Sequence, residues 1–126
     1  MFRTKLLSAF AVTTAFLLPT TFLNAQPQGQ VWSWGFARNG ELGTGSESNS
    51  SFPQHVKNIV FVDIDAKKSF SAGITPDGKV FTWGKNRNGI LGHLPANLNL
   101  LLPRQVEIGQ KVNQVSLGYQ TMCLVT

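Results

Sequence analysis

The stretch "VWSWGFARNGELGTG", residues 31–45, returns further along the chain as "VFTWGKNRNGILGHL", residues 80–94. Six residue types recur at one spacing of 49 positions: Trp34 with Trp83, Gly35 with Gly84, Asn39 with Asn88, Gly40 with Gly89, Leu42 with Leu91, and Gly43 with Gly92. Six coincidences at one spacing indicate an internal repeat. A period near 50 residues is typical of propellers and solenoids, so the repeat determines the fold class.

The segments between the repeated blocks have the patterns of strands and turns. In "VFVDIDA", residues 60–66, apolar and acidic side chains alternate, and we expect Asp63 and Asp65 to lie on a solvated strand face. "PDG", residues 76–78, predicts a hairpin turn. The segment 97–103 lies between Pro95 and Pro103 and is predicted to be a loop. Strands are predicted at 31–34, 54–58, 60–66, 69–75, 79–83, 104–108, 112–117 and 120–125, which is an all-β pattern.

The recurring positions favour structural roles, because a binding site usually requires its repeats to differ. Glycine after asparagine suits a positive φ, and glycine after tryptophan suits a close backbone approach. The tryptophans and leucines supply apolar surface to fill the space between blades. The positions expected to have structural roles are Trp34, Gly35, Asn39, Gly40, Leu42, Gly43, Asp77, Gly78, Trp83, Gly84, Asn88, Gly89, Leu91, Gly92 and Gly118.

The segment "AKKSFSAGITPDGKVFTWGKNRNGILG", residues 66–92, resembles the repeat of the regulator of chromosome condensation family. The resemblance rests on its Asp-Gly, Trp-Gly, Asn-Gly and Leu-Gly blocks together and covers residues 30–126. It implies a β-propeller of about seven blades, each of four antiparallel strands. The family's Gly and His before the apolar strand are Lys67 and Phe70 in one copy, and Gly118 and Thr121 in the other.

This chain holds about two of those blades and is expected to be an incomplete propeller. Its first repeat begins at the Trp-Gly strand, and its last repeat stops before an Asp-Gly hairpin. Two explanations stay open. The chain is a fragment of a longer propeller, which we favour, or it is a short form whose copies associate through their incomplete blades.

The N-terminus has the order of a targeting segment. Arg3 and Lys5 precede an uncharged apolar run, residues 6–18, which Pro19 ends. Residues 1–25 are therefore predicted to be a signal peptide, which implies a secreted or extracytoplasmic protein. A mitochondrial transit peptide is the alternative, because no acidic residue precedes Glu41. The run is too short for a stable membrane span. Residues 26–126 form the partial propeller, with Trp-Gly blocks at 31–45 and 80–94.

The composition favours few chemistries. The formal net charge is +5, without the basic runs of a nucleic-acid-binding protein. Cys123 is the single cysteine and lies in the apolar run "MCLV", where we expect it to be buried. His55 and His93 lack closely spaced ligand partners, so no metal, cofactor or catalytic residue is predicted. Asn49, in "NSS", is a possible N-glycosylation site.

The sequence therefore predicts a non-enzymatic protein–protein interaction module, whose loops contact a protein partner of unknown identity. Two alternatives come with the family resemblance. One is a guanine-nucleotide exchange factor for a Ran-like small GTPase, and the other is a secreted enzyme inhibitor. Neither alternative has support from individual residues of this chain.

Overall fold

The computed structural model describes residues 29–126, apart from the side chain of Lys57. The predicted signal peptide and its transit-peptide alternative lie outside these residues. The strands are β1 (Gly29–Gly35), β2 (Ser50–Phe61), β3 (Asp63–Lys67), β4 (Phe70–Ile74), β5 (Val80–Gly84), β6 (Leu100–Val106), β7 (Gln114–Leu117) and β8 (Met122–Val125), with a short 3-10 turn, η1 (Arg87–Gly89). The predicted all-β fold is confirmed.

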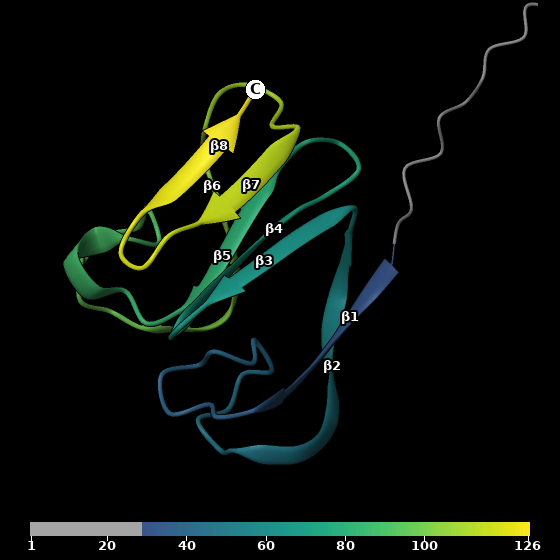
Figure 1. The fold of residues 1–126 in the computed structure, drawn as a ribbon, viewed down its shortest axis with the longest axis vertical. Coiled ribbons are helices and arrows are strands. Elements are labelled where there is room, and N and C mark those ends of the chain that lie inside the picture. The colour runs from purple at the N-terminus through teal and green to yellow at the C-terminus, as the bar shows by residue number, and fades with distance from the viewer. Residues whose placement is uncertain (1–28) are drawn as a thin grey trace, which may run out of the picture.

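The strands form three antiparallel sheets (Figure 1). The central blade has four strands in the order β3-β4-β5-β6. The N-terminal half-blade consists of β1 and β2, and the C-terminal half-blade consists of β7 and β8. In Figure 1 the two half-blades lie on opposite sides of the central blade. The architecture is therefore one complete propeller blade between two half-blades, as the repeat predicts.

The core lies between the central blade and the C-terminal half-blade. Strands β4 and β5 contribute buried apolar side chains on one face, and β7 covers them with its own. The buried members of this cluster are Phe70, Ala72, Ile74, Val80, Leu91, Val112, Val115 and Leu117. Burial of such side chains is the main stabilising term of a small domain.

Two of the predicted element boundaries are wrong. The predicted strand 60–66 is divided at Val62, where the chain leaves β2 and enters β3 of the next blade. The break lets Phe61 pack over Gly73 and against the ring of Trp83, with 5.8 Å between the ring centroids. The predicted loop 97–103 instead contains the start of β6, in which Pro103 is tolerated because β6 lies at the edge of its sheet.

The prediction that Cys123 is buried is also wrong, because its side chain is exposed. Along β8 the side chains alternate between the two faces of the half-blade. Met122 and Leu124 pack against the core, whereas Cys123 and Val125 point to the other face. An apolar run in a two-stranded sheet therefore has one side that no described residue covers.

The predicted Asp77-Gly78 turn is confirmed between β4 and β5. Gly78 has a φ of +81°, and Thr75 N donates to the carbonyl of Lys79 across the turn at 3.0 Å. Hydrogen bonds from the Lys79 ammonium, 2.7 Å away, and from the Thr75 hydroxyl lower the pKa of Asp77 to about 2. The carboxylate thus keeps its charge in this turn at acidic pH.

Candidate functional site

The two repeated tryptophans have opposite environments. Trp83 is 2% exposed, and its Nε1 donates to the carbonyl of Glu41 in the N-terminal half-blade at 3.0 Å. The Cα of Gly43 lies so close that an added Cβ would come within 2.8 Å of that nitrogen. Trp34 is 62% exposed. The prediction that both fill the space between blades is therefore correct for Trp83 and wrong for Trp34, whose outer face no described strand covers.

The repeated leucines have equivalent local structures in the two repeats. Leu42 and Leu91 are both buried. The hydroxyl of Ser33 donates to the Leu42 carbonyl at 2.6 Å, and the hydroxyl of Thr82 donates to the Leu91 carbonyl at 2.7 Å. Ser33 and Thr82 are 49 positions apart, so the repeat includes this bond even though the residue types differ.

Two asparagines outside the predicted set also occupy equivalent positions. Asn49 Oδ1 accepts from Ala37 N at 3.0 Å, and Asn99 Oδ1 accepts from Asn86 N at 3.2 Å. They are 50 positions apart, one more than the Trp-Gly blocks, and a comparison at a single spacing misses them. Asn49 is exposed, and its use as a glycosylation site stays a prediction.

Asn86 is a third residue whose structural role was not predicted from the sequence. It is almost fully buried, and its Oδ1 accepts from Leu91 N at 3.0 Å. Its Nδ2 lies 3.1 Å from the carbonyl of His93 and 3.2 Å from that of Pro95. Asn86 therefore fixes the loop between β5 and β6 from the inside, a role that Ala37 at the equivalent position of the first repeat cannot perform.

Asp63 and Asp65 do not lie on a solvated face, so that prediction is wrong. Asp65 Oδ2 accepts from Leu117 N at 2.8 Å, and Asp63 Oδ2 accepts from Val115 N at 3.3 Å. The second oxygen of Asp65 accepts from Ala66 N at 2.8 Å. The carboxylates thus satisfy the backbone N–H groups at the edge of β7 and connect β3 of the central blade with β7 of the C-terminal half-blade.

The role of Asp65 gives a first prediction. We expect Asp65→Ala to lower the free energy of unfolding by about 1–3 kcal/mol, because a half-buried N–H of Leu117 loses its partner. Urea denaturation followed by circular dichroism measures the change. Glu107→Ala is the control, since Glu107 is exposed and bonds only the side chain of Gln105 among the described residues. Equal destabilisation by both variants would contradict the proposed link between blades.

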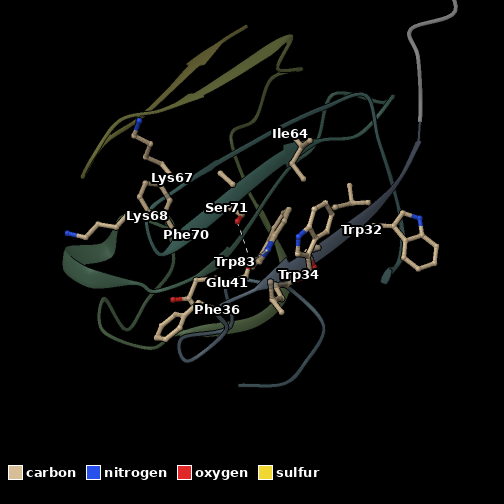
Figure 2. Close-up of a pocket in the computed structure, with 14 residues that line it drawn as sticks. Trp32, Trp34, Phe36, Glu41, Ile64, Lys67, Lys68, Phe70, Ser71 and Trp83 are labelled. Carbon is tan, nitrogen blue, oxygen red and sulfur yellow. Dashed lines mark hydrogen bonds between the residues drawn. The ribbon is translucent and has the colours of Figure 1, made fainter. Parts of the chain in front are cut away.

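An open groove lies beside Trp34 (Figure 2). Its volume is about 450 Å³, with β1 along one side and β3 along the other. Trp34 and Phe36 are exposed at its β1 side, and Ile64 is 42% exposed on β3. Figure 2 shows Trp83 and Ser71 between these two sides, and both side chains donate to the carbonyl of Glu41. We call this the β1–β3 groove.

A basic cluster lies where the central blade meets the C-terminal half-blade. Lys68 Nζ donates to the hydroxyl of Tyr119 and sits 3.9 Å from the centre of its ring. This hydrogen bond and the charge of Lys68 lower the pKa of Tyr119. A small pocket of about 70 Å³ here is also lined by Lys85 and Arg87, and by no acidic residue. Lys68, Lys85, Arg87 and Tyr119 are called the basic rim below.

The described residues offer no centre for metal chemistry. Within residues 29–126 no three His, Cys, Asp or Glu side chains are grouped closely enough to hold a metal ion. In the same part of the chain no helix is long and apolar enough to cross a membrane. The candidate sites among the described residues are therefore two surfaces, the β1–β3 groove and the basic rim.

Comparisons with known proteins agree with this architecture. The family model described as "Regulator of chromosome condensation (RCC1) repeat" matches residues 28–73 and 77–125, and a second model of the same repeat matches residues 61–90. The crystal structure of human WBSCR16 superimposes with a TM-score of 0.71 at 20% identity, over 77% of this chain and 26% of that one. No curated protein matches.

The structure of Prp20p from Saccharomyces cerevisiae superimposes with a TM-score of 0.54 at 17% identity, over 69% of this chain and 24% of that one. Prp20p is described with binding properties to Gsp1p and histones. This chain spans about a quarter of the length of both structures. The repeat matches cover well over half of its residues. The chain therefore belongs to the regulator of chromosome condensation (RCC1) repeat family, and its blades are those of a β-propeller.

Proposed function

We propose that this chain is a non-enzymatic protein-interaction module that binds an acidic segment of a partner protein at its basic rim. One observation carries the proposal: the pocket lined by Lys68, Lys85 and Arg87 is formed by turns of two adjacent blades and contains no acidic side chain. The geometry of this pocket depends on the packing of β7 on β3, and it requires no set of catalytic residues.

The distribution of charge favours an acidic partner at this edge. Lys67 ends β3 and Lys68 lies in the turn before β4, whereas Asp77 lies in the turn that follows β4, at the opposite end of the strand. Asp63 and Asp65 are already engaged with β7. Surface cations that are not neutralised by neighbouring acids attract and orient an acidic partner.

The Lys68–Tyr119 pair also prepares the site. The hydrogen bond and the ring contact hold the ammonium near the pocket mouth, which reduces the entropy lost when an acidic side chain binds. Tyr119 is exposed and offers a flat apolar surface beside the charges. Aromatic and cationic side chains together are typical of residues that dominate protein interfaces.

The test is a titration of the full chain with a fluorescent polyglutamate peptide. The double variant Lys68→Gln and Arg87→Gln is expected to bind roughly tenfold more weakly, because two exposed ion pairs are lost. Wild-type binding should weaken with added salt. The control is a double variant, Lys79→Gln and Lys111→Gln, which removes the same charge near the opposite turn. An equal loss in both variants would refute a site at the basic rim.

The guanine-nucleotide exchange alternative has one specific support, the likeness to Prp20p, which is described with binding properties to Gsp1p. We propose it second. Stimulated release of GDP from a Ran-like GTPase by the full chain, above the rate with buffer, would place it first. The secreted-inhibitor alternative has no support from a residue of the described structure.

We also propose export through residues 1–25, with mitochondrial import as the alternative. The proposal rests on the order of basic, apolar and polar residues in that segment. N-terminal sequencing of the protein from the medium, or from purified mitochondria, distinguishes the two. A first residue near Gln26 in secreted material would agree with export.

A further inference from the structure

Among the described residues, each half-blade ends in an unpaired edge at a strand whose equivalent in the central blade is paired on both sides. β1 pairs only with β2, and β8 pairs only with β7. In the central blade, the equivalent strands β4 and β5 pair with each other. β1 corresponds to β5 at a spacing of 49 residues, and β8 corresponds to β4 at a spacing of 51. The two free edges are therefore the two sides of one pairing that the central blade contains.

We propose that the free edge of β1 binds β8 of a second copy of this chain, so that β7 and β8 of one copy and β1 and β2 of the next form one four-stranded blade. The β1–β3 groove of one copy then binds the C-terminal half-blade of the other copy. An exposed strand edge readily accepts another strand, so the pairing needs no new backbone conformation.

The central blade gives the register of this pairing. Ala72 lies opposite Thr82, and Ile74 lies opposite Val80. Ala72 corresponds to Cys123 at the spacing of 51, and Thr82 corresponds to Ser33 at the spacing of 49. The same pairing therefore places Cys123 of one copy opposite Ser33 of the next. It likewise places Val125 opposite Val31, which is half-buried at the groove.

The exposed faces of the two half-blades are complementary in the same register. Cys123 and Val125 are exposed on β8, at positions where β4 has the fully buried Ala72 and Ile74. In the β1–β3 groove of the other copy they would cover Ile64, which lines it. Burial of these side chains removes apolar surface from water on both copies, which favours association.

The polar groups of β7 fit the same arrangement. Gln114 and Ser116 correspond to Asp63 and Asp65 at the spacing of 51, and both are exposed. Asp63 and Asp65 accept backbone N–H groups of the next innermost strand. Gln114 and Ser116 can accept in the same way, here from β3 of the second copy.

Trp34 provides the anchor on the other face of the new blade. Trp83 donates to the carbonyl of Glu41 and packs on Gly43. The equivalent groups 49 residues on are the carbonyl of Ile90 and the exposed Gly92. The Trp34 ring of one copy can therefore pack against Ile90 and Gly92 of the other. A large aromatic anchor in a matching seat is typical of the residues that carry binding energy.

A second copy is favoured as occupant because both sides of the pairing occur on one chain, in one consistent register. Each copy adds about two blades, and propellers close with about four to eight, so a closed ring holds about two to four copies. Head-to-tail contacts of this kind are heterologous and close only when the rotation between copies permits.

A disulfide trap tests the register in the full chain. Ser33→Cys places a thiol opposite Cys123 of the second copy, and mild oxidation should give covalent dimers and longer ladders on a non-reducing gel. The matched control is Gln54→Cys. Gln54 lies opposite Ser33 on β2, one strand further from β8, so its thiol is about 10 Å from Cys123 and beyond disulfide reach.

Light scattering gives an independent readout. We expect wild type to have the mass of about two to four chains, and Trp34→Ala to shift it to the monomer. Adding Cys123→Ser to the Ser33→Cys variant should remove the ladder. A wild-type monomer at micromolar concentration, folded or unfolded, overturns the proposal, as does equal cross-linking by Ser33→Cys and Gln54→Cys. Either result means that something other than a second copy covers the edge of β1.

Discussion

Replacing Trp83 with alanine is expected to lower the free energy of unfolding by about 3–5 kcal/mol, the cost of truncating a large buried aromatic side chain. The same replacement at Trp34 is expected to change it by less than about 0.5 kcal/mol, as is usual at exposed positions. The two residues are equivalent in the repeat, so the difference measures what the neighbouring half-blade contributes to Trp83.

The contacts of Trp83 explain the large effect. Its ring packs on Phe61 and on Gly43, and its Nε1 holds the Glu41 carbonyl. Alanine would leave a cavity between two sheets and an unpaired half-buried carbonyl. Domains of this size have total stabilities of about 5–15 kcal/mol, so the variant should lose a large part of its folded population at 37 °C.

Urea denaturation monitored by circular dichroism measures both variants, at a protein concentration low enough that copies do not associate. Trp83→Phe serves as a second control, because it keeps most of the apolar contact and removes only the hydrogen bond to Glu41. A similar stability for Trp83→Ala and Trp34→Ala would mean that the N-terminal half-blade does not stabilise the central blade.

The two repeated tryptophans also show which features of the structure can be predicted from the sequence. A spacing of 49 residues identifies the blade, its turns and the positions that can pack, because these depend on local chemistry. Burial depends on whether another sheet lies alongside. Trp83 has the N-terminal half-blade as its neighbour, whereas no described sheet lies against Trp34. Because both residues are tryptophan, the residue type alone does not predict this difference in burial.

The prediction for the aspartates of β3 was wrong for the same reason. A period-two pattern assigns Asp63 and Asp65 to a polar face, and the natural inference from one strand is that this face meets water. The face instead meets the backbone edge of β7. Asn49 and Asn99 differ in kind: their spacing of 50 is present in the sequence, and a comparison that allows one inserted residue finds it.

Gly84→Ala is expected to be the second severe substitution, with a loss of about 2–5 kcal/mol. Gly84 has a φ of +100°, which costs an L-residue roughly 1–2 kcal/mol. The added Cβ would lie 2.5 Å from the carbonyl oxygen of Ser69 and 2.8 Å from the Cα of Phe70. Both are backbone atoms where the turn enters β4, so the sheet itself must shift, at a further cost of about 1–3 kcal/mol.

Gly35→Ala is the matched control for this clash. Gly35 holds the equivalent position with a φ of +113°, and an added Cβ would meet no atom within 4 Å. In the isolated chain it should cost only the backbone strain, roughly 1–2 kcal/mol. The difference in urea midpoints between the two variants then isolates the close approach of β4 to β5. Equal losses would show that strain alone accounts for the preference for glycine.

The same pair connects folding with association. If β8 of a second copy lies along β1, the backbone of Gln120 and Thr121 approaches Gly35 as that of Ser69 and Phe70 approaches Gly84. Gly35→Ala should then leave the isolated chain folded but reduce the oligomer seen by light scattering. An unchanged oligomer would mean that no strand approaches this edge of β1. A glycine that is unconstrained within one chain thus becomes constrained when a second strand completes the blade.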